Sequence, residues 1–92
     1  MGDERIRRRV VVHGRVQGVF FRDTVRRAAR QRGVAGWAAN RPDGTVEVWL
    51  EGEQDGVDSM LRVLHDGPPR ADVERVDVDD VEPQGLSAFE IC

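Results

Sequence analysis

A glycine-rich segment followed by an arginine is the part of this chain best suited to chemistry. In Gly14–Arg22 (GRVQGVFFR), two glycines flank a polar turn, and Arg22 begins a segment with helical spacing. Glycine allows positive φ angles and close approach to a ligand, so that successive backbone N–H groups can converge on one anion. A following helix N-terminus adds a positive field, and a guanidinium group matches the geometry of phosphate oxygens. The segment therefore predicts a phosphate-binding loop closed by Arg22.

Simpler interpretations of the same residues remain open from local sequence alone. Gly14 and Gly18 also suit a strand end and a turn, and Arg22 also suits a solvated surface position. A cation at a helix N-terminus opposes the helix dipole, however, which favours a bound anion as the reason for Arg22. A nucleotide P-loop is excluded, because the segment lacks the longer glycine spacing and the Lys-Ser/Thr pair that such loops carry.

A second segment, Gly36–Gly52, begins GWAANRPDGTVE and places Asn40 just before a turn. Taken locally, Asn40 is more typical of a turn residue than of a catalytic one. The two segments together, in this order and at this separation, resemble the two signatures of the acylphosphatase family. The resemblance covers the first half of the chain.

The resemblance implies hydrolysis of the carboxyl–phosphate bond of small acyl phosphates, which releases a carboxylate and inorganic phosphate. Arg22 matches the family's phosphate-binding arginine, and Asn40 matches the asparagine that orients the attacking water. The loop backbone completes the substrate site with the N–H groups of Arg15, Val16, Gln17, Gly18 and Val19. A carboxylate leaves readily near neutral pH, so neither a general acid nor a cofactor is expected. The chain departs from the family pattern at two places. Arg41 stands where a small hydroxyl residue is frequent, and Glu90-Ile91-Cys92 replaces the frequent aromatic ending.

Other reactive side chains are weaker candidates. His13 stands beside the loop and His65 in the second helical segment, but neither has a visible partner in sequence. Thr24 and Ser59 lack a base, which favours direct attack by water over a covalent intermediate. No metal is predicted, because the acidic residues of 72–82 alternate with valines as on the outer face of a strand. The side chain of Gln17 is expected to face solvent.

The apolar spacing predicts the elements that position these residues. Strands are expected at 6–12, 34–39, 45–51 and 73–81, with a short closing strand at Phe89 and Ile91. Helices are expected from Asp23 to about Arg32 and around 57–64, where glycine or Gly-Pro-Pro follows. The inward parity changes between Val73 and Val76, which indicates a bulge or a late strand start. The order βαββαβ predicts an α+β, ferredoxin-like sandwich with both helices on one face of an antiparallel sheet. The aromatic residues are expected in the core or half buried in the sheet: Phe20, Phe21, Trp37, Trp49 and Phe89.

Length and composition limit the remaining possibilities. The 92 residues suit a single domain over 1–92, and no apolar run is long enough for a transmembrane helix. Cys92 is the one cysteine, so no internal disulfide can form, which fits the cytoplasmic location that we expect. A small single domain is also expected to be a monomer. Residues 1–33 carry ten arginines and three acids, but residues 34–92 carry four and fourteen, giving a net charge of −3. This balance fits a local site for a small anion better than nucleic-acid binding.

Two alternatives to an enzyme stay open at this point. Acylphosphatase-like domains also occur in larger proteins, so the chain could be a non-catalytic phosphate or acyl-phosphate sensor. Ferredoxin-like sheets can also bind single-stranded RNA, although that function needs exposed aromatic residues on the central strands, where only Trp49 is available.

Overall fold

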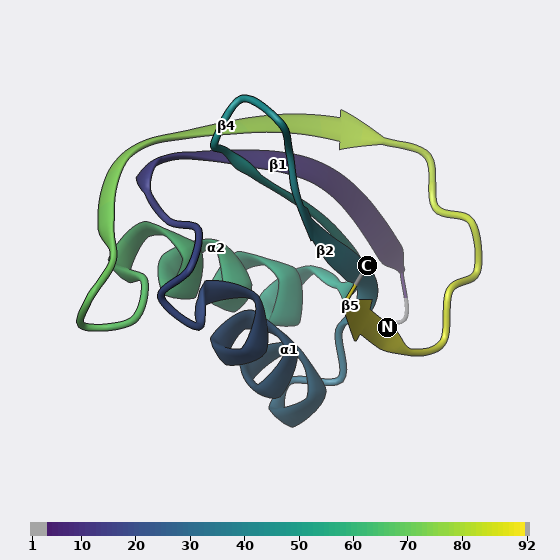
Figure 1. Cartoon of the computed structure of the whole chain (residues 1–92). Helices are drawn as coiled ribbons and strands as arrows, with labels where there is room; N and C mark the ends of the chain where they lie inside the picture. Colours follow the sequence, from purple (N-terminus) through teal and green to yellow (C-terminus); the bar gives the residue numbers. More distant parts are fainter. Residues whose placement is uncertain (1–3, 92) are drawn as a thin grey trace.

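In the computed structural model, which describes residues 4–91, two helices cover one face of a twisted five-stranded sheet (Figure 1). The strands follow the order β4-β1-β3-β2-β5 across the sheet. The elements are β1 (Arg5–Arg15), α1 (Phe21–Gln31), β2 (Ala35–Asn40), β3 (Val46–Glu53), α2 (Gln54–Asp66), β4 (Asp72–Val81) and β5 (Phe89–Ile91). The predicted ferredoxin-like βαββαβ arrangement is confirmed, with α1 two residues longer at its start than expected.

The expectation of a purely antiparallel sheet is wrong in one strand. β1, β2, β3 and β4 pair antiparallel, but β5 lies parallel to β2, with Gly36 opposite Phe89. After β4, the connection at 82–88 crosses to the other edge at the same end of the sheet (Figure 1). The chain therefore re-enters the sheet running opposite to β4, which is the direction of β2. The sheet is mixed.

The parity change in the last long strand is a bulge, as one of the two predicted possibilities stated. His13 pairs with Arg75 and Gly14 with Val73, so Glu74 is an extra residue on β4. β1 continues past its expected end to Arg15 because Gly14 fits this irregularity. Gly14 has φ +125°, and a Cβ atom there would lie 2.1 Å from the Asp72 carbonyl oxygen, so the bulge requires glycine.

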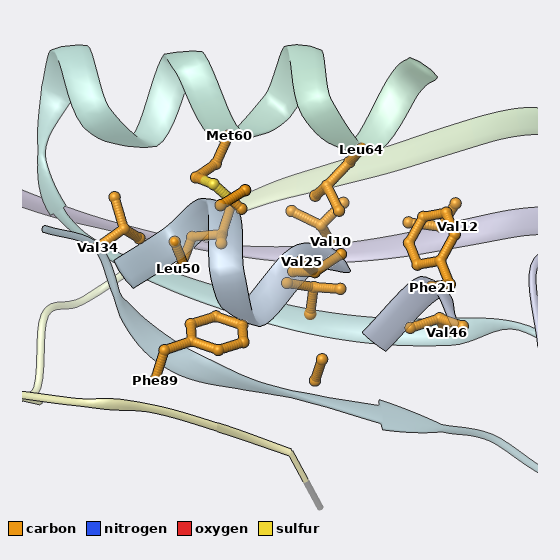
Figure 2. Packing of buried hydrophobic residues seen from close by; sticks show 14 of the residues in the cluster. Val10, Val12, Phe21, Val25, Val34, Val46, Leu50, Met60, Leu64 and Phe89 are labelled. Atoms are coloured by element: carbon orange, nitrogen blue, oxygen red, sulfur yellow. The ribbon is translucent and has the colours of Figure 1, made fainter. Parts of the chain in front are cut away.

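The core lies between the sheet and the two helices. Phe21, Val25, Ala28 and Ala29 of α1 are buried, as are Val57, Met60 and Leu64 of α2. They pack on Val10, Val12, Val46, Leu50 and Phe89 from the sheet (Figure 2). Trp37 and Trp49 are half buried as expected, but the prediction for Phe20 is wrong, because this side chain is 78% exposed.

A buried carboxylate on β3 holds the connection that leads to β5. Glu51 is fully buried and accepts hydrogen bonds from the backbone N–H groups of Gln84, Gly85 and Leu86, at 2.6 to 3.2 Å. Arg7 lies 3.6 Å from the same carboxylate. Burial alone would raise the pKa of Glu51, but the three N–H donors outweigh it and hold that pKa below its ordinary value of 4.5. Glu51 thereby fixes the segment that carries Phe89 and Ile91 back to the sheet.

Replacing Glu51 with Gln should lower the free energy of unfolding by about 2–3 kcal/mol at neutral pH, because charge-assisted bonds to buried donors are lost. Since the folded pKa lies below the unfolded one, this stabilisation is complete above about pH 4.5 and disappears as the pH falls through the folded pKa. Urea unfolding at pH 7 and at pH 3–4 measures both effects, with the exposed Glu53→Gln as the control on the same strand. Equal stability of the wild type and Glu51→Gln at pH 7 would contradict this role.

Candidate active site

A cavity of about 280 Å³ lies between the loop at 16–20, the start of α1, the end of β2 and β5. β1 and β2 both pair antiparallel with β3, so they run in the same direction, and their C-terminal ends lie at the same end of the sheet. This topology places the loop after β1 beside the end of β2. Arg22 and Asn40, which are 18 positions apart in sequence, therefore line one cavity. Its lining consists of Val16, Gly18, Phe20, Phe21, Arg22, Asp23, Asn40 and Ile91.

Two residues of the predicted phosphate-binding loop, Val16 and Gly18, line the cavity. Val16 is 1% exposed and anchors the loop in the core, and Gly18 is exposed and also lines the cavity. Gly18 has φ +74°, with nothing within 4 Å of the position a Cβ atom would take. The backbone is thus open to a ligand at this point. Arg15 belongs to β1 rather than to the loop, and Arg15, Gln17 and Val19 are outside the cavity lining.

The N-terminus of α1 opens on this cavity. Phe20, the residue before the helix, has a left-handed conformation, with φ 59° and ψ 26°, and cannot cap the helix with its side chain. This N-cap residue makes no side-chain capping hydrogen bond, and its carbonyl accepts from the Thr24 N–H at 3.0 Å. The first N–H groups of an α-helix have no acceptor within the helix. An anion beside Gly18 and Arg22 would meet these donors and the positive end of the helix dipole.

Asp23 is an acid in the lining of a site expected to bind an anion, but its charge is compensated. Arg26 donates to one carboxylate oxygen at 2.6 Å and Arg27 to the other at 2.9 Å. The hydrogen bond from Arg26, the largest effect, and that from Arg27 hold the pKa of Asp23 below its ordinary value, although burial opposes them. Arg26 and Arg27 therefore compensate the charge of Asp23 within α1 itself.

Gln17 has a role that the sequence did not predict. The expectation that its side chain faces solvent is wrong. Nε2 donates to the carbonyl oxygens of Arg41 and Thr45, both at 2.8 Å. These carbonyls belong to the connection between β2 and β3, directly after Asn40. Gln17 thus ties the loop of the cavity to the turn that carries Asn40. No local signal could have revealed it, because the acceptors lie 24 and 28 positions along the chain.

Asn40 is the last residue of β2 and is exposed at the cavity. The turn behind it is tightly bonded: Arg41 N–H donates to the Thr45 carbonyl at 2.9 Å, and Asp43 accepts from the Thr45 backbone and hydroxyl. The predicted turn at Asp43-Gly44 is confirmed. The guanidinium of Arg41 lies 3.9 Å from Glu47 on β3, so an ion pair holds the bulky residue that departs from the family pattern.

The remaining reactive side chains lie outside this cavity. His13 bonds to Asp77 of β4 at 2.9 Å, and Thr24, Ser59 and His65 are not part of the cavity lining. Within residues 4–91, no three His, Cys, Asp or Glu side chains form a group that could hold a metal ion. Cys92 and the N-terminal residues 1–3 lie outside the described part of the chain.

Comparison with known proteins decides the family. The family model of acylphosphatase matches residues 8–91. The chain belongs to the acylphosphatase family. An acylphosphatase of Rubrobacter xylanophilus is 53% identical, over 90% of this chain and 76% of that protein. An acylphosphatase of Anaeromyxobacter dehalogenans is 51% identical, over 96% of both chains.

A solved acylphosphatase structure supports the same assignment. The acylphosphatase crystal structure from Bacillus subtilis superimposes with a TM-score of 0.92 at 36% identity, covering 95% of this chain and 98% of that one. Membership of the acylphosphatase family confirms the expectation of a hydrolase that acts on acyl phosphates. None of the helices in the described range is long and apolar enough to cross a membrane.

Proposed function

We propose that this chain hydrolyses small acyl phosphates by direct, in-line attack of a water molecule that Asn40 orients on a phosphoryl group held by Arg22 and the loop backbone. The observation that carries the proposal is that Arg22 and Asn40 line one cavity, into which Gly18 and the start of α1 also open. Family membership supports the substrate class. The roles of the single residues rest on their chemistry and positions.

The proposed step needs few groups. The water oxygen forms a new bond to phosphorus while the bond from phosphorus to the acyl oxygen breaks. The electron pair of that bond leaves with the carboxylate, and the proton lost by the water passes to the product phosphate. Arg22 and backbone N–H groups stabilise the charge on the equatorial oxygens. The Asn40 amide accepts a hydrogen bond from the water and donates one to a phosphoryl oxygen, which fixes the direction of attack.

The decisive test is hydrolysis of benzoyl phosphate by the purified chain, with a chelator present and inorganic phosphate as inhibitor. We expect turnover that the chelator does not affect and that inorganic phosphate inhibits competitively, because product and substrate share the phosphoryl site. Absence of turnover from folded protein would favour a phosphate or acyl-phosphate sensor. Turnover lost with the chelator would overturn the metal-independent mechanism. The cytoplasmic location, the monomeric state and the absence of a cofactor stay predictions.

The RNA-binding alternative gains little from the sheet surface. Trp49 stacks on Trp37, with ring centroids 5.7 Å apart, and the guanidinium of Arg7 lies 4.3 Å from the centre of the Trp49 ring. These contacts occupy the ring that a base would need for stacking. We therefore favour the enzyme.

A further inference from the structure

Phe20 is an exposed aromatic residue at the rim of the cavity. Phe20 is 78% exposed and is one of the residues that line the same cavity as Arg22 and Asn40, whereas the adjacent Phe21 is 2% exposed and packs in the core. Within residues 4–91, the other large exposed hydrophobic residue is Val78, which lies on β4 and not in this cavity. The exposed ring of Phe20 therefore stands where a bound substrate would pass.

The backbone of Phe20 is unfavourable for such a residue. It is the one residue other than glycine with a positive φ angle in the described range 4–91. A bulky side chain rarely adopts this conformation, and glycine or asparagine would adopt it at lower cost. Because the ring is exposed, burial does not compensate for the strain. Strained residues of this kind cluster at ligand sites, so a role in binding explains Phe20 better than stability does.

The cavity has a polar part and an apolar part. Arg22, Asn40 and the start of α1 provide the polar part, while Phe20 and the half-buried Ile91 of β5 provide apolar surface. An acyl phosphate has the same division, with a charged phosphoryl group joined to an acyl group. The volume of about 280 Å³ lies just below that of pockets for drug-sized ligands, so it suits a small molecule.

We propose that Phe20, with Ile91, forms the acyl-binding side of the site and favours acyl phosphates whose acyl group is aromatic or bulky and apolar. This inference rests on the proposed function and adds substrate preference to it. With the phosphoryl group at Gly18 and Arg22, the acyl group contacts the Phe20 ring. An aromatic acyl group stacks on this ring, whereas an acetyl group is too small to cover it.

The test compares benzoyl phosphate with acetyl phosphate as substrates of the wild type and of Phe20→Ala. We expect Phe20→Ala to lower kcat/KM for benzoyl phosphate by about fivefold, with acetyl phosphate changed by less than about twofold. Inhibition by inorganic phosphate should stay unchanged, because the phosphoryl site is intact. Phe20→Tyr keeps the ring and should restore the preference, and Val78→Ala is the control for loss of an exposed apolar side chain.

Binding of non-hydrolysable phosphonates separates this inference from the proposed function. By calorimetry, the wild type should bind benzylphosphonate more tightly than methylphosphonate, and Phe20→Ala should lose that difference even if no substrate is turned over. Equal losses for both substrates, or an unchanged ratio, would overturn the acyl-binding role while leaving the hydrolase intact. An unchanged ratio together with a shift from dimer to monomer in Phe20→Ala would show instead that the ring contacts a second copy of the chain.

Discussion

Replacing Asn40 with Ala should reduce kcat for benzoyl phosphate by about 10²–10³-fold, the usual loss when one preorganised polar group leaves an active site. KM and the inhibition constant of inorganic phosphate should change little, because Arg22 and the loop still hold the phosphoryl group. Steady-state kinetics with phosphate as a competitive inhibitor measures all three quantities. A loss confined to kcat is what removal of the group that directs the water predicts.

The position of Asn40 makes this variant easy to interpret. The side chain is exposed at the end of β2, so its removal should change the free energy of unfolding by less than about 0.5 kcal/mol. The turn behind it keeps its own hydrogen bonds between Arg41 and Thr45. Gln31→Ala, which removes an exposed amide at the end of α1, serves as the control. Near-normal kcat in Asn40→Ala would refute the assigned role.

Much of the fold can be predicted from the periodic spacing of apolar residues along the chain. The spacing of Phe21, Val25, Ala28 and Ala29 predicts the buried face of α1, and the structure buries all four. The parity change before Val76 indicated the irregularity that Glu74 creates. Such features are readable because the alternation of inward and outward residues is set by the backbone itself.

The parts that could not be predicted depend on contacts between distant residues. Neither the charge nor the spacing of Glu51 shows that its carboxylate binds three N–H groups more than 30 positions away. The parallel pairing of β5 depends on the route of the segment that Glu51 fixes. The prediction for Phe20 is wrong because the sequence does not distinguish two adjacent phenylalanines. Both line the cavity, but the left-handed backbone before α1 leaves Phe20 exposed and Phe21 in the core.

The sequence allowed a prediction of which residues form the site, but not of the contacts that hold them in place. The order of the two signature segments located Arg22 and Asn40, and the structure shows both in one cavity. What joins them is the side chain of Gln17, which bonds to the turn after Asn40. Val16 in turn anchors the loop in the core. The glycine loop is thus fixed immediately before Gly18, which lowers the cost of ordering it around a phosphate.

Replacing Arg22 with Gln should have a different kinetic signature from the loss of Asn40. Arg22 lies in the first turn of α1, where its charge opposes the helix dipole, and it lines the cavity at that end. If it holds the phosphoryl group, its removal weakens binding of substrate and product and also stabilisation of the transition state. We expect kcat/KM to fall by about 10³-fold and the inhibition constant of inorganic phosphate to rise by at least about tenfold.

Two further variants separate the geometry of Arg22 from its charge. Arg22→Lys keeps the charge but loses the planar fork that contacts two phosphate oxygens, so it should recover only part of the activity. Arg62→Gln removes an exposed arginine from α2, outside the cavity lining, and should leave kcat/KM within about twofold of the wild type. If Arg22→Gln kept the wild-type affinity for phosphate while losing kcat, Arg22 would act on the transition state alone. Binding of the ground-state phosphate would then fall to the loop and the start of α1.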